Sequence, residues 1–324
     1  MFLKSAKRIS VILSVFVVVF IIACPGHAQS KNEGLQGRIT ISGAWALYPM
    51  AVKWAEEFQN IHPGIKIDIS AGGAGKGIAD TLSNVVDLGM VSRDIDPQEV
   101  KKGVWSLPVV KDAVVVTVNA DNPALKDILA HGLKKDIFQG IFVSGKIKTW
   151  GDALNNNSTA AINVYTRSDS CGAAETWAKY LGAKQEDLMG IGVYGDPGVA
   201  QAVRKDKLGI GFNNINFAYD AKTRAPVAGI KIVPIDVNGD GRIDHNEGPY
   251  EDLPGIMAAV AGGEYPSPPA RELYFISKGN PERREVRAFL HWVLSDGQKF
   301  VADAGFIVLS QQSIDEGLKK TGNE

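Results

Sequence analysis

Short β-branched runs alternate with amphipathic stretches along the first third of the chain. Apolar and polar positions alternate with a period of two at RITIS (38–42), IKIDIS (65–70) and VDLGMVS (86–92), which predicts strands. Helical periodicity is found between them, at YPMAVKWAEEFQNIHPG (48–64) and AGGAGKGIADTLS (71–83). This order of strand, helix, strand, helix, strand is typical of a parallel sheet.

A second α/β unit follows the apolar stretch LPVVKDAVVVTVN (107–119), for which we expect a long strand pair. The pattern then predicts helices within 134–154, a strand at 162–168, a helix at 171–182 and a strand at 208–214. IKIVPI (230–235) predicts a strand that returns to the first unit, followed by a helix from Leu253, the strand ELYFIS and two helices ending near Ala304.

We therefore expect an α/β protein of two lobes joined by two crossover segments, with a ligand cleft between the lobes. Lobe 1 would comprise residues 37–115 and 234–310, and lobe 2 residues 116–233.

The first 24 residues have the pattern of a signal peptide. Lys4, Lys7 and Arg8 precede the apolar run VILSVFVVVFIIA, which is too short to span a bilayer comfortably. Two cleavage sites are possible, because IIAC ending at Cys24 resembles a lipobox, whereas GHA ending at Ala28 resembles an ordinary site. We expect an exported protein, periplasmic or extracytoplasmic, that is either soluble or lipid-anchored through Cys24.

The charge and cysteine content limit the classes of partner and of cross-link that the protein can have. With 35 basic and 36 acidic residues, a net charge of -1 gives no electrostatic reason to expect nucleic acid as a partner. If the protein binds an anion, the positive charge that selects it would have to come from residues close to the binding site. Once Cys24 is lipidated or removed, Cys171 is the sole remaining cysteine, which excludes an intramolecular disulfide.

Three loops follow predicted strands and open helices: SGAWALYP (42–49), SAGGAGKGI (70–78) and RSDSCGAAE (167–175). In α/β lobes the carboxyl ends of strands face the ligand, and backbone amides at helix N-termini bind anions. The glycines allow the backbone to approach a ligand closely. Arg167 adds a planar guanidinium suited to bidentate anion binding.

These loops resemble those of the phosphate-binding solute receptors of ABC transporters, a family with the type 2 periplasmic-binding-protein fold. The resemblance covers nearly the whole mature chain and rests on SGAWALYP, SAGGAGKGIADTL, VDLGMVSRDI, IFQGIFVSGKIKTWGD, RSDSCGAAETW, LGIGFNNINFA and GGEYPSPPARELYFIS. It implies a monomeric binding protein that captures an oxyanion, phosphate first, and presents it to an ABC transporter permease.

The resemblance also implies the ligand-binding residues. It places the first ligand loop on Ala44, Trp45 and Ala46, the second on Gly73, Ala74 and Gly75, the proton-accepting carboxylate on Asp87, the guanidinium on Arg167, and the rest of the site on Cys171, Gly172 and Ala173.

This chain departs from the family by lacking hydroxyls. Family members usually supply serine or threonine at several positions where this chain has alanine, tryptophan or cysteine. Because each hydrogen bond to a charged group contributes ~1.5–3 kcal/mol, the loss favours a different anion, such as an organic anion or a soft oxyanion like arsenite, unless water or amides compensate. Trp45 would stack on a planar group or a cation, or pack beneath the cleft. Asp87 would bind the ligand or be a structural cap.

Cys171 allows three interpretations. It is a small buried hydrophobe, or a weak donor or soft ligand whose pKa is lowered by Arg167 and the helix N-terminus. As a nucleophile it would make the protein a thiol enzyme, but His62, His131, His245 and His291 all lie outside the cleft loops. We therefore expect no enzyme, and a binding protein for transport or, alternatively, a sensory receptor subunit.

One segment has the pattern of a metal-binding loop rather than of an anion-binding loop. DVNGDGRIDHNE, from Asp236 to Glu247, matches the twelve-residue EF-hand loop at every ligand position. The predicted calcium ligands are Asp236, Asn238, Asp240, the carbonyl of Arg242, Asp244 and Glu247. Because a strand precedes the loop, we expect a structural calcium ion in an insertion near the hinge, or else a solvated acidic turn.

Overall fold

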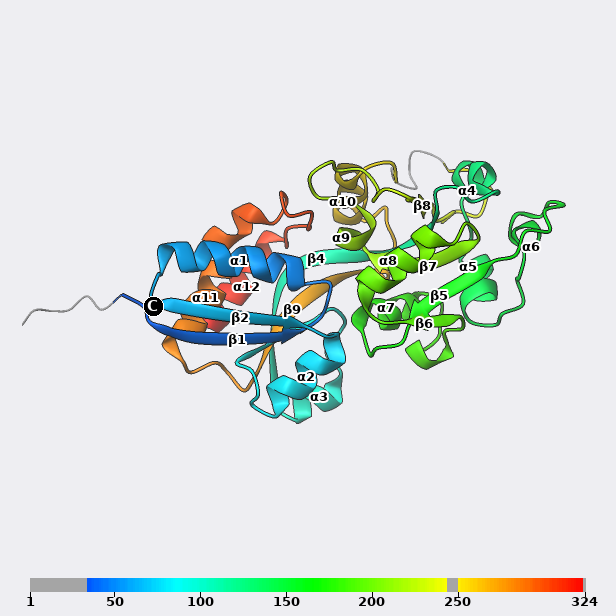
Figure 1. The fold of residues 1–324 in the computed structure, drawn as a ribbon. Coiled ribbons are helices and arrows are strands. Elements are labelled where there is room, and N and C mark those ends of the chain that lie inside the picture. The colour runs from blue at the N-terminus through cyan, green and yellow to red at the C-terminus, as the bar shows by residue number, and fades with distance from the viewer. Residues whose placement is uncertain (1–33, 244–249, 323–324) are drawn as a thin grey trace, which may run out of the picture. The chain divides into compact units, whose positions relative to one another are not determined.

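The computed structural model describes residues 34–243 and 250–322. The predicted leader, Asp244 and Glu247 lie outside these residues. Within them, nine strands form a sheet in the order β2-β1-β3-β9-β4-β7-β5-β6, and β8 also pairs with β4 (Figure 1). Across these same residues, no helix combines the length and hydropathy needed to cross a bilayer.

The strands are short except for the two that run between the lobes. They are β1 (Gly37–Gly43), β2 (Ile65–Ala71), β3 (Leu88–Val91), β4 (Val104–Asn119), β5 (Asn163–Arg167), β6 (Ile191–Val193), β7 (Gly209–Asn214), β8 (Ile230–Val233) and β9 (Ala270–Lys278). As predicted, β1, β2 and β3 are parallel. In lobe 2, the predicted strands β5 and β7 pair in parallel with each other, and β5 also pairs in parallel with the unpredicted short strand β6. The expected strand pair at 107–119 is instead part of the single strand β4.

Helices cover the sheet on both lobes (Figure 1). They are α1 (Tyr48–Ile61), α2 (Ala74–Leu82), α3 (Pro97–Lys101), α4 (Leu125–His131), α5 (Lys135–Phe142), α6 (Trp150–Leu154), α7 (Gly172–Tyr180), α8 (Gly195–Lys205), α9 (Ile215–Ala218), α10 (Leu253–Gly262), α11 (Arg284–Leu294) and α12 (Gln311–Thr321), with 3-10 turns η1 (Gln185–Asp187) and η3 (Asp296–Phe300).

Two hydrophobic cores define the two lobes. In the first, α1 buries Met50, Trp54 and Phe58 at helical spacing, and Trp54 Nε1 donates to the Gly297 carbonyl at 2.8 Å. Each such large side chain contributes roughly 1.5–3 kcal/mol when buried. This core comes from residues between Ile39 and Val110 and again between Leu273 and Ile314.

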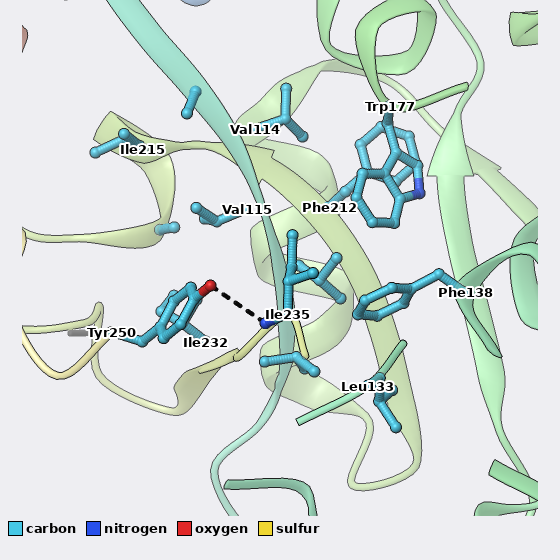
Figure 2. Packing of buried hydrophobic residues seen from close by; sticks show 14 of the residues in the cluster. Val114, Val115, Leu133, Phe138, Trp177, Phe212, Ile215, Ile232, Ile235 and Tyr250 are labelled. Carbon is cyan, nitrogen blue, oxygen red and sulfur yellow. Dashed lines mark hydrogen bonds between the residues drawn. The ribbon is translucent and has the colours of Figure 1, made fainter. Parts of the chain in front are cut away.

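The second core is built around Trp177 of α7. Its ring lies 5.2 Å from Phe138 and 5.6 Å from Phe142, centroid to centroid, both edge to face. Figure 2 shows Trp177 with Phe138 and Phe212, and the hydrogen bond from the Ile235 amide to the Tyr250 hydroxyl, which is 3.2 Å long.

The return from lobe 2 to lobe 1 comes later in the chain than the sequence suggested. Ile232 and Ile235 lie in the second core, as does Leu253 of α10, so residues 234–243 and 250–269 do not belong to lobe 1. The two crossovers are β4 and β9, which pair antiparallel with Asp112 opposite Arg271. On either side of this pair the buried residues of both strands change from one core to the other.

Candidate functional site

The loops predicted to hold a ligand lie at one edge of the sheet and come from both lobes. In lobe 1 they follow β1 and β2, and in lobe 2 the loop 168–171 follows β5 and leads into α7. The two lobes touch here: the Gly75 amide donates to the Ser170 carbonyl at 3.4 Å. A Cβ on Gly73, whose φ is +91°, would lie 2.5 Å from that same carbonyl oxygen. Glycine is therefore required at position 73, because its positive φ disfavours other residues and because a side chain would clash with the Ser170 carbonyl oxygen.

Arg167 lies at the predicted position, at the end of β5, but its guanidinium is already paired. Nε and Nη2 donate to the two carboxylate oxygens of Asp169 at 2.8 and 2.6 Å, and Nη1 donates to Asp196 at 2.5 Å. Burial alone would lower the pKa of Arg167, but Asp196 and Asp169 beside it raise the pKa instead. The guanidinium is thus permanently charged and faces two carboxylates, so this cluster offers an anion no net positive charge.

The two carboxylates are held in place by the lobe 2 backbone. Asp169 Oδ1 accepts from the Gly195 amide at 3.1 Å, and Asp196 Oδ1 accepts from the Asn214 amide at 3.0 Å. Asp196 opens α8, a helix to which we assigned no ligand-binding residue. No local signal marks it in the sequence, because Asp196 is 29 residues from Arg167.

Cys171 is the N-cap of α7. Its Sγ accepts from the Ala174 amide at 3.5 Å, so the thiol takes the role that a hydroxyl usually has at this position. Burial raises the pKa of the thiol to about 12, although the nearby Arg167 charge acts to lower it. The hypothesis of a lowered pKa was wrong, because Asp169 and Asp196 oppose that charge and solvent is excluded. Gly172 and Ala173 follow as the buried first residues of α7.

The first ligand loop is buried partly in the core of lobe 1 and partly against lobe 2. Ala44 and Ala46 are buried. The Trp45 ring meets Tyr194 of lobe 2 edge to face at 6.0 Å, and lies 3.3 Å from where a Cβ on Gly195 would be. One edge of the indole therefore packs against lobe 2. Trp45 Nε1 is buried and has no hydrogen-bond partner among the described residues.

Asp87 is not at this edge of the sheet. It immediately precedes β3, whereas the ligand loops follow the carboxyl ends of the strands parallel to β3. Its Oδ2 accepts from the Thr40 amide at 2.8 Å and from the Thr40 hydroxyl at 2.9 Å, and Oδ1 pairs with Arg283. Asp87 is thus a structural residue of lobe 1, and its assignment as a ligand-binding residue was wrong.

Ser92 occupies the corresponding position at the correct end of β3. A Cβ on Gly172 would lie 2.3 Å from the Ser92 hydroxyl and 2.2 Å from its carbonyl oxygen, so Ser92 lies directly against the start of α7. The next residue, Arg93, pairs with Glu99 of its own lobe and with Glu175 of α7. The rule that residues following a strand face the cleft would have found both.

Comparison with known proteins settles the family. A profile described as a PBP superfamily domain matches residues 28–297. The chain belongs to the PBP superfamily.

Several relatives of this PBP-superfamily chain are named for phosphate. It is 26% identical to the phosphate-binding protein PstS of Methanocaldococcus jannaschii, over 90% of this chain and 89% of that protein. It is 29% identical to PstS of Bacillus subtilis, over 71% of this chain and 77% of that protein. A Clostridium perfringens structure, described as a phosphate ABC transporter substrate-binding protein with bound phosphate, superposes with a TM-score of 0.69 at 22% identity, covering 85% of this chain and all (100%) of that one. The fold is that of the superfamily.

A second buried guanidinium in this PBP-superfamily chain escaped sequence reasoning. Arg271 of β9 reaches Asp112 of β4 at 3.4 Å and also donates to Asn214 Oδ1, both through Nη2. Burial raises the pKa of Asp112 to about 7, although the charge of Arg271 and backbone hydrogen bonds from Ala113 and Ile215 act to lower it.

The described part of the predicted calcium loop is a series of tight turns, each closed by an Asp or Asn side chain that accepts from backbone amides a few residues further on. Asp236 accepts from the amides of Gly239 and Gly241 at 2.6 and 2.9 Å. Asn238 Oδ1 accepts from the Asp240 amide, and Asp240 Oδ1 from the Arg242 amide, each at 2.8 Å. Within the described residues, which omit 244–249, the structure gathers no three His, Cys, Asp or Glu side chains able to hold a metal. Asp236, Asn238 and Asp240 fit the first half of a calcium loop, and the predicted ligands Asp244 and Glu247 lie outside the described residues.

Proposed function

We propose that this chain is an exported solute-binding protein that captures an oxyanion, phosphate first, between its lobes and presents it to an ABC transporter permease. The observation that carries the proposal is the meeting of two glycine-bearing loops across the lobe boundary, where the Gly75 amide bonds to Ser170 and Gly172 packs on Ser92. Closure of this kind removes water from a small ligand. The phosphate-binding names of relatives over most of the chain support the choice of ligand.

A different anion is the second candidate. Arg167 is neutralised by Asp169 and Asp196, and the loops carry alanine, tryptophan and cysteine where hydroxyl donors were expected. Both features weaken the case for a doubly charged phosphate at Arg167 itself. An enzyme acting through Cys171 is disfavoured, because burial raises the thiol pKa to about 12 and the thiolate is the nucleophile.

Thermal unfolding of the leaderless protein separates these candidates. The melting temperature is measured alone and with phosphate, sulfate, arsenate, arsenite or small organic anions. A ligand at about one hundred times its dissociation constant adds ~2.7 kcal/mol to the free energy of unfolding. A shift with phosphate and arsenate but not sulfate supports the proposal. If only another anion raises the melting temperature, that anion replaces phosphate as the proposed ligand. If no anion changes the melting temperature, the result contradicts anion capture.

The calcium loop is proposed as a structural site. Calcium would take oxygens from Asp236, Asn238 and Asp240 together with the predicted ligands Arg242, Asp244 and Glu247. Its location next to β8 supports a role in fixing the loop on lobe 2. The expected result of adding a calcium chelator is a lower melting temperature that calcium restores and magnesium does not. A chelator-insensitive melting temperature in a protein free of metal by elemental analysis contradicts it.

We also propose that the mature protein is monomeric and extracytoplasmic. The pattern of residues 1–24 supports export, and Cys24 decides between a lipid anchor and a soluble form. In cells expressing the full chain, Cys24→Ala moves the protein from the membrane to the soluble fraction if Cys24 is lipidated. An unchanged soluble distribution indicates cleavage after Ala28.

A further inference from the structure

A charged hollow of about 840 Å³ lies at the end of lobe 1 where β1 begins, β9 ends and α11 begins. The ligand loops follow the carboxyl ends of β1 and β2, so this hollow is at the opposite end of these strands. Side chains of both signs line it. The cations are Arg38, Lys278, Arg283 and Arg287, and the carboxylates are Asp87 and Glu282.

Two further cations lie beside the hollow. Lys66 of β2 is the register partner of Arg38, so both side chains are on the same face of the sheet. Arg284 is the first residue of α11 and lies three residues before Arg287, which places the two on one side of the helix. We call this group of residues, with those that line the hollow, the basic end of lobe 1.

Most carboxylates of the basic end are already paired. Arg283 pairs with Asp87 and Glu285, and Arg38 pairs with Asp68. The remaining charged side chains are exposed and form no ion pair within residues 34–243 and 250–322; they are Lys66, Lys278, Arg284, Arg287 and Glu282. Four unpaired cations therefore face one unpaired carboxylate, although the whole chain has a net charge of -1.

The described chain also begins at the basic end (Figure 1). Gly37 lies so close to α11 that a Cβ there would be 2.7 Å from Glu285 Oε1. Residues 25–33 separate Cys24 from Gly34, the first described residue. Because an extended chain of this length spans at most about 35 Å, a lipid on Cys24 would keep the basic end close to the bilayer surface.

We propose that the basic end binds anionic phospholipid headgroups at the membrane surface. This inference rests on the proposed export of the chain and not on the identity of its ligand. Exposed lysines and arginines are attracted to an anionic membrane within about 10 Å of its surface. Contact through this end leaves the ligand loops uncovered, because they lie at the other end of β1 and β2. Attraction by a few salt-screened charges is reversible, so the protein stays free to reach a permease.

The test is co-sedimentation of the leaderless protein with phosphatidylcholine vesicles that contain or lack phosphatidylglycerol. The wild type is expected to bind the anionic vesicles alone and to be released by salt. The variant Lys278→Gln/Arg284→Gln/Arg287→Gln removes three unpaired cations of the basic end. Since each lysine or arginine near an anionic surface contributes about fivefold, we expect binding at least about tenfold weaker.

A matched control removes the same charge from lobe 2. Lys146→Gln/Lys148→Gln/Lys207→Gln changes three exposed lysines and is expected to leave vesicle binding within about twofold. The side chains replaced in both variants are exposed, so we expect both proteins to fold, and equal melting temperatures verify it. Equal weakening by the two variants would show an effect of net charge and overturn the role of the basic end. A wild type that binds no anionic vesicles overturns it as well.

Calorimetric titration of the same proteins with phosphate separates this inference from the proposed function. The basic end is remote from the ligand loops, so phosphate affinity should be equal in the wild type and both variants. A wild type that binds anionic vesicles through the basic end but takes up no phosphate keeps the inference and refutes phosphate capture. A wild type that binds phosphate but no anionic vesicles keeps the proposed function and refutes the inference.

Discussion

Arg167 Nη1 and Asp196 Oδ2 are 2.5 Å apart, and both side chains are completely shielded from solvent. Asp169 pairs with the other side of the same guanidinium. The residue that sequence reasoning took as the anion's main partner is therefore part of an internal ion cluster of lobe 2. Such clusters fix geometry at high desolvation cost, and removing a partner exposes the remaining charge to new ligands.

Replacing Asp196 by asparagine is expected to strengthen anion binding. The asparagine side chain keeps an oxygen for the Asn214 amide but removes one of the two carboxylate charges opposing Arg167. We expect at least about fivefold higher phosphate affinity, corresponding to ~1 kcal/mol, together with a lower free energy of unfolding because a buried charged hydrogen bond is lost. Calorimetric titration measures the phosphate affinity, and urea unfolding measures the free energy of unfolding. Asp152→Asn, at the exposed start of α6, is the matched control, and weaker binding by Asp196→Asn would contradict this account.

The two ion pairs between the lobes are expected to differ in their effect on closure. Arg93 Nε meets Glu175 at 2.7 Å, with Arg93 mostly buried, whereas Lys179 and Asp94 are both largely exposed. Exposed pairs contribute about 0–1 kcal/mol, so Lys179→Met should leave ligand affinity within about twofold. Glu175→Gln should weaken it several-fold and reduce its salt dependence. Calorimetric titrations at low and high salt measure the ligand affinity of each variant and its salt dependence. Equal effects of the two variants would show that the burial of an ion pair does not decide its effect on ligand affinity.

Cys171 is expected to be unreactive in the folded protein. Because burial raises the thiol pKa to about 12, the thiolate is scarce near neutral pH, and the Sγ atom is enclosed. Alkylation by iodoacetamide at about pH 8 should be at least ~100-fold slower than in urea, since the thiolate is the reacting species. Mass spectrometry follows the reaction. Rapid labelling of the folded protein would restore the reactive-thiol hypothesis.

Asp112 is expected to make stability depend on pH. Burial raises its pKa to about 7 in the folded protein, against about 3.9 for an unfolded aspartate. Between these values the folded chain binds a proton that the unfolded chain does not. The contribution of Asp112 to the free energy of unfolding therefore falls as the pH rises from about 4 to about 7.

The variant Asp112→Asn isolates this contribution. Urea unfolding of wild type and variant across that range should show the wild type losing stability relative to the variant as pH rises. A difference that is constant with pH, or that grows in favour of the wild type, would show that Asp112 is ionised throughout.

The periodic pattern predicted the parallel part of lobe 1 correctly because its helices are amphipathic and its strands alternate. In lobe 2 it predicted β5, α7 and β7 but missed β6 and α8. The pattern failed for the elements whose lobe is determined by the chain topology. β8 and α10 have ordinary local patterns, and only the core they enter, around Ile232 and Leu253, reveals that they belong to lobe 2. The sequence contains no local signal that distinguishes one apolar core from another.

The loops of the candidate site were predicted to lie together, but the charge partners of its buried side chains were not. The glycines at 73, 75 and 172 were identified from their loops, and they lie where the lobes meet. Asp87 was assigned by resemblance to a family, but it precedes β3 and so lies at the opposite end of that strand from the ligand loops. Asp196 and Arg271 could not be found locally, since the partners Arg167 and Asp112 lie 29 and 159 residues away. Charge balance in a buried site depends on such distant partners.

The central claim is that the two lobes enclose one oxyanion, phosphate first. Calorimetric titration of phosphate into the calcium-loaded, leaderless protein in the presence of excess sulfate tests it most directly. We expect saturable binding of one phosphate per chain that sulfate does not abolish. A folded protein that takes up no phosphate at any concentration tested, with or without sulfate, would contradict it.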